Sequence, residues 1–355
     1  MLLFLIVALP LSAQQVPEKD RFKAWDRNSD GKLERSELPR KLQSNFVRVD
    51  EDGDGFITRA EHQRILARMR SPQGRPQRLL PDSIEVRRDL DYVGDGNPRQ
   101  TLDLLVPKER AESQELLPLI VFVHGGGWRK GNKESGLRKL LPFVESGDYA
   151  GATINYRLTN ESSWPTQIHD CKAAIRYLRG HAEKFGIDPE KIAVWGTSAG
   201  GHLVSMLGTS GGVKELEGDL GDFDDQSSAV SCVMNYFGPQ NFNSMIDQQS
   251  KIDRSPDKGY PEALLLGGSV QERGGLAKQA SPVTWVSSDD PPFLTAHGTK
   301  DPVVPFAQGE EIHTALEKAG VESELVRVEG AGHGFASKGV DTRVKAFLRK
   351  HLHGK

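Results

Sequence analysis

The sequence predicts an α/β protein: a mostly parallel sheet with helices on both faces, preceded by a small all-α module. Two observations support this prediction. From about residue 81 onward, short apolar runs alternate with segments whose apolar residues recur at helical spacing. Before residue 71, two acidic twelve-residue segments stand between apolar residues at helical spacing. We therefore divide the chain into a leader at 1–13, a helical module at 18–70, a polar, proline-rich linker at 71–81 and an α/β domain at 82–355.

The composition argues against several classes of function. A chain of 355 residues suits one large domain with a small appendage, and it is long enough to bury a sizeable core. Its net charge of -3 and its pI near 6.4 provide no basic field of the kind that nucleic-acid binding requires. We therefore expect no nucleic-acid partner. We also expect no transmembrane span, because no apolar stretch approaches the necessary length.

Residues 1–13 have the character of a secretory signal. An apolar run ends at Ala13, after which the chain turns polar. Two details depart from the usual pattern, since no Lys or Arg precedes the run and Leu11 stands where a small residue is common. We expect cleavage after Ala13 and an exported protein, periplasmic or extracellular.

Two twelve-residue segments, 26–37 and 50–61, match the loop of an EF-hand. Calcium needs six or more oxygen ligands, which this loop supplies at positions 1, 3, 5, 7, 9 and 12 around a glycine at position 6. The expected ligands of the first loop are Asp26, Asn28, Asp30, the carbonyl of Lys32, Glu34 and Glu37. Those of the second loop are Asp50, Asp52, Asp54, the carbonyl of Phe56, Thr58 and Glu61.

One such match is also compatible with an acidic surface turn, but two complete matches close together favour a calcium-binding pair. Leu33 and Ile57 occupy position 8 of the two loops. We expect them to meet in a short β-bridge, as in paired hands.

Seven apolar runs in the α/β domain predict strands, and two periodic segments predict helices. The expected strands are residues 102–106, 119–123, 150–156, 192–195, 230–236, 293–297 and 325–328. The expected helices include residues 168–178 and 312–319, the second ended by Gly320. Cys171 falls in the first helix and Cys232 in a strand. We expect two buried free thiols, and a disulfide between them remains an alternative.

Ser198 stands at the centre of Gly-x-Ser-x-Gly, residues 196–200, between an expected strand and an expected helix. A bare match of this kind also occurs in ordinary turns. Here the flanking elements favour a nucleophile elbow, in which glycines allow a sharp turn that presents the hydroxyl at its tip.

A second glycine-rich segment follows the strand at 119–123 and reads His124-Gly-Gly-Gly-Trp128. Successive glycines let bare backbone amides approach a developing oxyanion. We expect the amides of Gly125, Gly126 and Ala199 to form this site. His124 is expected to brace the loop, and Trp128 to contact the substrate.

A base and an orienting acid are expected after the last two strands. Asp301 follows the strand at 293–297 and His333 the strand at 325–328, which gives the chain order Ser, Asp, His. Five other residues compete for these roles: His202, Asp289, Asp290, His297 and His313. We expect structural positions for His202 and His297 and a solvated position for His313, and the two aspartates stand at the wrong end of their strand.

Together these motifs resemble the hormone-sensitive-lipase-like esterases of the α/β-hydrolase superfamily, and more narrowly the branch of bacterial feruloyl and acetyl-xylan esterases. The resemblance spans roughly residues 102–352 and rests on six segments: 124–128, 155–158, 196–202, 281–282, 297–305 and 330–335. It implies an α/β-hydrolase fold in which residues 237–288 contribute a lid and an acyl pocket. That segment is polar and glycine-rich, which favours a small soluble ester over an interfacial lipase substrate.

The expected function is therefore hydrolysis of short-chain or aromatic acyl esters, including acetylated or feruloylated carbohydrate, through an acyl-enzyme on Ser198. Calcium would bind the N-terminal module without being required for the chemistry. Two alternatives stay open: a formamidase or amidase with the same triad, and a calcium-dependent binding protein with an inactive hydrolase fold. The natural acyl and alcohol groups and the oligomeric state are not predicted.

Overall fold

A computed structural model of the chain describes residues 21–39, 43, 46–50, 52, 54–70, 80–109 and 116–354. The chain divides into two compact units, Met1–Leu80 and Pro81–Lys355. The expected signal at 1–13 and nearly all of the expected linker at 71–81 lie outside the described residues.

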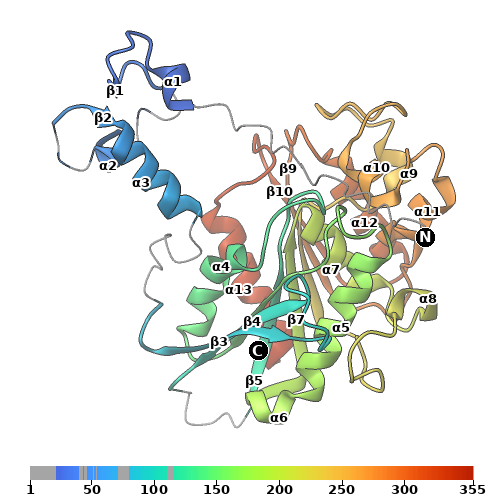
Figure 1. The fold of residues 1–355 in the computed structure, drawn as a ribbon. Helices are drawn as coiled ribbons and strands as arrows, with labels where there is room; N and C mark the ends of the chain where they lie inside the picture. The colour runs from blue at the N-terminus through green and yellow to red at the C-terminus, as the bar shows by residue number, and fades with distance from the viewer. Residues whose placement is uncertain are drawn as a thin grey trace, which may run out of the picture. The chain divides into compact units, whose positions relative to one another are not determined.

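The first unit is small and mostly helical. Its elements are α1 (Arg21–Trp25), β1 (Lys32–Leu33), α2 (Phe46–Val49), β2 (Ile57–Thr58) and α3 (Arg59–Arg70), shown in blue in Figure 1. Five buried apolar side chains form its core: Phe22, Leu33, Leu38, Phe46 and Ile57.

The two short strands of this unit confirm the expected β-bridge. β1 and β2 pair in antiparallel fashion, with Leu33 opposite Ile57. The pairing places position 8 of each acidic loop at the centre of the module, where both side chains are buried.

The second unit is built on an eight-stranded sheet in the order β10-β9-β8-β7-β5-β6-β4-β3. Its strands are β3 (Ile84–Asp91), β4 (Thr101–Pro107), β5 (Leu117–Val123), β6 (Ala150–Ile154), β7 (Ile187–Thr197), β8 (Cys232–Tyr236), β9 (Phe293–Gly298) and β10 (Ser323–Val328). The pairs from β10 through β6 are all parallel, whereas β4 runs antiparallel to both β6 and β3. The expected mostly parallel sheet is confirmed.

All seven expected strands are present, although β7 begins well before the expected residue 192, at Ile187, and β3 was not predicted. Its sequence, Ile-Glu-Val-Arg-Arg-Asp-Leu-Asp, is strongly charged, and most of its side chains are partly or fully exposed. The strand lies at the edge of the sheet, and its register with β4 shifts between Arg87 and Leu90. An edge strand with a bulge shows no clear alternation of apolar and polar residues, so its sequence resembled a loop.

Helices cover both faces of the sheet, because the central strands are apolar on both sides. Along β5, Val121 and Val123 belong to one buried cluster and Ile120 and Phe122 to the other. Helices α5 (Thr166–Gly180), α7 (Ala199–Thr209) and α12 (Ala307–Lys318) pack on the first face, and α4 (Glu134–Val144) and α13 (Lys338–His353) on the second. Figure 1 shows α5 and α7 flanking the strands.

Short helices complete the unit. α6 (Ala182–Phe185) and α8 (Lys214–Glu217) follow α5 and α7, and the segment between β8 and β9 contains α9 (Phe242–Met245), α10 (Pro261–Leu266), α11 (Gly274–Gln279) and η2 (Pro282–Thr284). This segment has no long helix, as expected from its polar sequence. Within the described residues, no helix combines the length and hydropathy needed to cross a membrane.

The two cysteines are free and buried. Cys171 lies in α5 and Cys232 in β8, in the clusters on opposite faces of the sheet. Burial raises the pKa of both thiols well above their usual range. The expectation of two inert core thiols is confirmed.

Candidate active site

Ser198 lies at a strained turn between β7 and α7. Its backbone has φ 55° and ψ -122°, a conformation that few residues with a side chain adopt. A Cβ on Gly196 would lie 2.1 Å from the carbonyl oxygen of Gly200, and one on Gly200 would lie 2.1 Å from that of Val123. The Ser198 N–H donates to the carbonyl of Tyr236 at 2.9 Å, which ties the turn to β8. Neither position has room for a side chain, so both glycines are required by close packing as well as by the geometry of the turn.

Two loops bring an imidazole and a carboxylate to this serine. His333 Nε2 lies 2.9 Å from Ser198 Oγ, and His333 Nδ1 lies 2.7 Å from Asp301 Oδ2. Nδ1–H donates to the carboxylate in this arrangement, which leaves Nε2 free to accept from the serine hydroxyl. The carboxyl of Asp301 is fully buried and the imidazole of His333 is 21% exposed. The structure thus brings together all three residues that chain order predicted.

The loops after β9 and β10 hold each other in place. Lys300 N donates to the carbonyl of Ala331 at 2.9 Å, and Thr299 N donates to that of Val328 at 3.1 Å. A Cβ on Gly298 would lie 2.5 Å from the Ala331 oxygen, so the loops pack closely only because this residue is glycine. The parallel pairing of β9 and β10 puts both loops at the same edge of the sheet.

Asp301 is held in its charged form. Burial by itself would raise the pKa of its carboxyl, but hydrogen bonds from His297, His333 and the Val303 amide outweigh burial and hold the pKa well below the usual range. The Val304 amide also donates to Oδ1, at 3.0 Å. Asp301 is therefore an anion at neutral pH and can stabilise a positive charge on His333.

The glycine-rich segment after β5 lies beside the serine turn. A Cβ on Gly125 would lie 2.6 Å from the Thr197 oxygen and 3.3 Å from Ser198 Cβ. No backbone carbonyl among the described residues accepts a hydrogen bond from the amides of Gly125, Gly126 or Ala199. Gly125 thus lies close to the serine, and the amides of all three residues are available to a ligand.

Buried polar contacts brace this segment from behind. His124 Nδ1 lies 2.8 Å from the Gly125 carbonyl, and its ring stacks on Tyr156 at 4.3 Å. Burial lowers the pKa of His124 to about 4, so the ring is neutral. Further along, buried Lys133 forms ion pairs with Asp89 and Asp103. His124 therefore braces the loop, as predicted.

The competing residues occupy structural positions. His297 is buried, and its Nε2 lies 3.0 Å from the Val304 carbonyl. His202 is also buried, with Nε2 2.6 Å from the Ala280 carbonyl and the ring stacked on Phe242. His313 Nδ1 bonds to Ser323 Oγ at 2.9 Å, Asp290 accepts from Ser287, and Asp289 is exposed. His313 is partly buried and hydrogen bonded, so the expectation that it is solvated was only partly right.

A cavity of about 650 Å³ opens over Ser198 and His333. Trp128 lines it but is 1% exposed, and its ring packs edge-on against His202 and Phe242. A direct contact of Trp128 with substrate therefore stays a prediction.

Sequence reasoning missed most of the remaining wall of this cavity, which includes Arg129, Lys130, Phe237, Pro239, Pro261, Glu262, Val303 and Val304. Phe237 directly follows a strand, and Val303 and Val304 follow Asp301 closely, so position next to a predicted site could have indicated them. Pro261 and Glu262 had no such signal.

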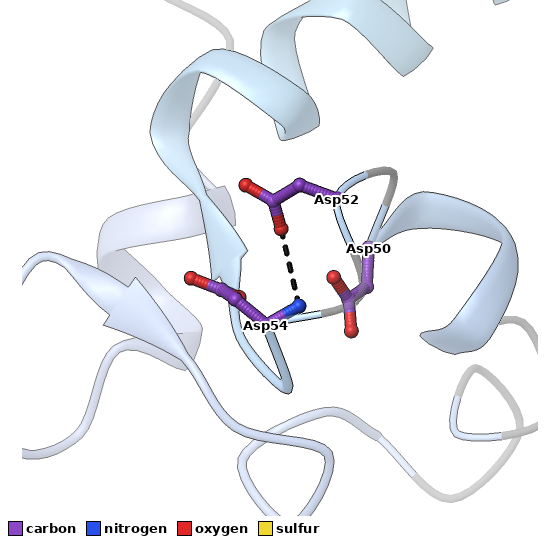
Figure 2. Close-up of side chains that lie close together, drawn as sticks. All are labelled: Asp50, Asp52 and Asp54. Atoms are coloured by element: carbon purple, nitrogen blue, oxygen red, sulfur yellow. Dashed lines mark hydrogen bonds between the residues drawn. The ribbon is translucent and has the colours of Figure 1, made fainter.

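The second acidic loop of the N-terminal unit can hold a cation. Oxygens of Asp50, Asp52 and Asp54 lie within 4.8 Å of one another, and Figure 2 shows the three side chains around one small space. Asp54 N donates to Asp52 Oδ1 at 3.2 Å, and Gly55 has φ +87°, as the bend of the loop requires. A cation bound between the three carboxylates would offset their mutual repulsion, and their hard oxygen donors suit Ca²⁺.

The first loop has the corresponding geometry. Asp26 accepts from the amides of Asp30 and Gly31 at 3.2 and 3.0 Å, and Gly31 has φ +81°. Glu37 Oε2 accepts from the amide of Glu34 at 2.9 Å. In the second loop the amide and hydroxyl of Thr58 likewise donate to Glu61, at 2.8 and 2.7 Å. The donor sets at both loops fit a calcium ion, with Lys32 and Phe56 offering backbone carbonyls.

Comparison with known proteins agrees with this geometry. Residues 19–43 and 42–66 each match the EF-hand family model. Esterase LipC of Mycobacterium tuberculosis is 30% identical over 251 residues, which are 70% of this chain and 60% of LipC. The chain thus spans less than two thirds of the length of that relative.

Two solved structures share the fold of the second unit. A truncated carbohydrate esterase from gut microbiota is 29% identical with a TM-score of 0.67, covering 77% of this chain and 98% of that chain. Esterase 2 of Thermogutta terrifontis, with propionate bound, is 28% identical with a TM-score of 0.57, covering 76% of this chain and 92% of that chain. The α/β-hydrolase fold expected from the motifs is confirmed. Because the BD-FAE family model matches residues 102–316, more than half of the chain, this protein belongs to the BD-FAE family.

Proposed function

We propose that this protein is a serine ester hydrolase that acts on short-chain or aromatic acyl esters, including acetylated or feruloylated carbohydrate. The observation that carries the proposal is the continuous hydrogen-bond path from Ser198 Oγ through His333 to Asp301. The names of the relatives support it, since LipC is an esterase and a structural neighbour is a carbohydrate esterase. The propionate in the Thermogutta structure supports a short acyl group.

The reaction follows from the positions of the side chains. His333 Nε2 takes the proton of Ser198 as Oγ attacks the ester carbonyl, and the amides of Gly125, Gly126 and Ala199 stabilise the negative oxygen. His333 then gives that proton to the departing alcohol, which leaves an acyl-enzyme. A water molecule, deprotonated by the same nitrogen, attacks the acyl carbonyl, and the proton returns to Ser198 as the acid is released.

Replacing Ser198 tests this proposal directly. We expect Ser198→Ala to lower kcat on a p-nitrophenyl acetate substrate roughly 10⁴-fold or more, because the nucleophile is lost. A fluorophosphonate probe should label the wild-type protein and fail to label the variant. The matched control is Ser210→Ala, which removes a buried hydroxyl at the far end of α7. Near-normal turnover by Ser198→Ala would contradict the assignment.

For the N-terminal unit, we propose that each acidic loop binds one Ca²⁺, through Asp26, Asn28, Asp30, Lys32, Glu34 and Glu37 and through Asp50, Asp52, Asp54, Phe56, Thr58 and Glu61. The two EF-hand matches and the paired loops support this. We also propose export of the protein, on the apolar character of residues 1–13. Extracellular EF-hands bind calcium at about 10⁻⁴–10⁻³ M, which suits a structural ion outside the cytoplasm.

A further inference from the structure

The cavity over Ser198 carries two exposed cations on its wall. Arg129 and Lys130 directly follow Trp128 and line this cavity, and we call them the cationic rim. Both side chains are exposed, and neither forms an ion pair with any residue in the described part of the chain. Their charge is therefore free to act on a ligand.

The backbone of the rim is fixed to the proposed oxyanion site. The amides of Arg129 and Lys130 both donate to the Gly126 carbonyl, at 3.3 and 3.2 Å. A Cβ on Gly126 would lie 2.0 Å from the Lys130 oxygen, so the turn is tightly closed. Because Gly126 also carries one of the proposed oxyanion amides, the backbone of the rim keeps a fixed position relative to that site.

The acidic residues of the cavity wall do not balance the charge of the rim. Glu262 is the one acid among the described residues that line it. It is 3% exposed and already paired with Arg254, whose Nε and Nη2 lie 3.2 and 3.3 Å from its carboxylate oxygens. Glu262 and Arg254 cancel each other, and the buried Asp301 behind His333 offsets at most one of the two rim charges, so the cavity keeps an excess positive charge.

We infer that the preferred substrates are esters that carry a carboxylate near the ester bond, such as an acylated uronic acid unit. This inference rests on the proposed ester hydrolysis and narrows its substrate class. A carboxylate near the rim is stabilised by Coulomb attraction to the two cations, and the positive potential of the cleft also speeds its approach. A neutral ester of the same shape has neither advantage. The effect should weaken with salt, because the rim is exposed.

The experiment compares two esters that differ in charge and little in shape, 4-acetoxybenzoate and 4-acetoxybenzamide. Their kcat/KM ratio is measured for the wild-type protein and for Arg129→Gln/Lys130→Gln, so that the intrinsic reactivities cancel. We expect the ratio to fall roughly tenfold in the variant, mainly through KM. In the wild-type protein, raising the salt from about 0.05 to 0.5 M should lower the ratio in the same direction.

Two control variants isolate the charge at this position. Arg129→Lys/Lys130→Arg keeps both charges and should keep most of the preference. Arg138→Gln/Lys345→Gln removes two exposed cations outside this cavity, so it changes the net charge equally and should leave the ratio unaltered. A second pair, 4-nitrophenyl hemisuccinate and 4-nitrophenyl butanoate, tests a carboxylate on the acyl side.

The outcomes separate this inference from the proposed function. If the wild-type protein hydrolyses the neutral esters but the ratio of charged to neutral ester falls for neither pair in Arg129→Gln/Lys130→Gln, the inference is overturned and ester hydrolysis stands. If it hydrolyses none of the four, the proposed function fails. If the rim variant loses all turnover, the salt dependence of the wild-type ratio decides, and a ratio that does not change with salt overturns the inference.

Discussion

The role of each histidine in and around this site follows from the groups that its ring contacts, because the side chain itself is the same at every position. The protein contains ten histidines, and several of them lie near strand or helix ends. His333 is distinguished because one ring nitrogen contacts Asp301 and the other contacts Ser198. His124 and His202 instead bond to backbone carbonyls. A histidine bonded only to the backbone braces the fold, and one between a carboxylate and a hydroxyl can move a proton.

Two of the buried histidines, His124 and His202, make the stability of the second unit depend on pH. Burial lowers the pKa of both His124 and His202 to about 4, from 6.5 when exposed. Between these values the unfolded chain binds more protons than the folded one, so the free energy of unfolding is highest above pH 6.5 and falls as the pH decreases toward 4. The loss approaches about 3 kcal/mol per histidine over the whole interval.

Urea unfolding at several values between pH 7 and pH 4.5 measures this loss. His202→Gln removes one of the two titrating groups. It should therefore reduce the slope of unfolding free energy against pH by up to about 1.4 kcal/mol per pH unit, which is the contribution of one proton. An unchanged slope in the variant would show that His202 does not titrate on unfolding.

At the scale of elements, the site depends on how closely loops from neighbouring strands can approach. The turn between β7 and α7 meets the loop after β5 at Gly200, where a Cβ would lie 2.1 Å from the Val123 oxygen. The loops after β9 and β10 meet in the same way at Gly298. Glycines at these contacts let the ends of four strands, β5, β7, β9 and β10, come close together.

Gly200→Ala tests the packing of the elbow. The added methyl group has no room, so we expect the free energy of unfolding to fall by roughly 1–3 kcal/mol and turnover to fall with it, because the turn must shift. Gly211→Ala, near the end of the same helix, places its methyl group in open space and should change stability by less than about 0.5 kcal/mol. Denaturant unfolding of both variants provides the comparison, and equal effects would contradict the packing argument.

At the scale of the whole molecule, the two proposed functions fall in separate units. Ser198, Asp301 and His333 all lie in Pro81–Lys355, whereas both acidic loops lie in Met1–Leu80. The contacts that define the proposed active site are made within the second unit. Calcium should therefore stabilise the first unit without taking part in ester hydrolysis.

Removing calcium from the full chain tests this separation. We expect chelation to lower the melting temperature of the first unit, because the carboxylates of Asp50, Asp52 and Asp54 then repel one another, and to change turnover little. Calorimetric titration should give two ions per chain, and Glu37→Gln and Glu61→Gln should each remove one. A large loss of turnover on chelation would contradict the separation.

The sequence by itself determined the features that depend on neighbours along the chain. The acidic loops, the elbow around Ser198, the triple glycine and seven of the eight strands of the main sheet all have local signals, because turn geometry and strand burial act on adjacent residues. The positions of Asp301 and His333 could also be predicted from the sequence. Each follows an expected strand, and neighbouring parallel strands end at the same edge of the sheet.

Only the tertiary structure decided the features that depend on distant segments. The charged edge strand β3 is held by its register with β4. The carbonyl of Tyr236 fixes Ser198 from a different strand. Pro261 and Glu262 reach the cavity from the segment between β8 and β9. Arg129 and Lys130 have no distinguishing signal in the sequence. They gain significance because packing places them on the wall of the cavity that contains Ser198, where the one acid among the described lining residues is neutralised by Arg254. Such contacts join residues far apart along the chain, and no local pattern records them.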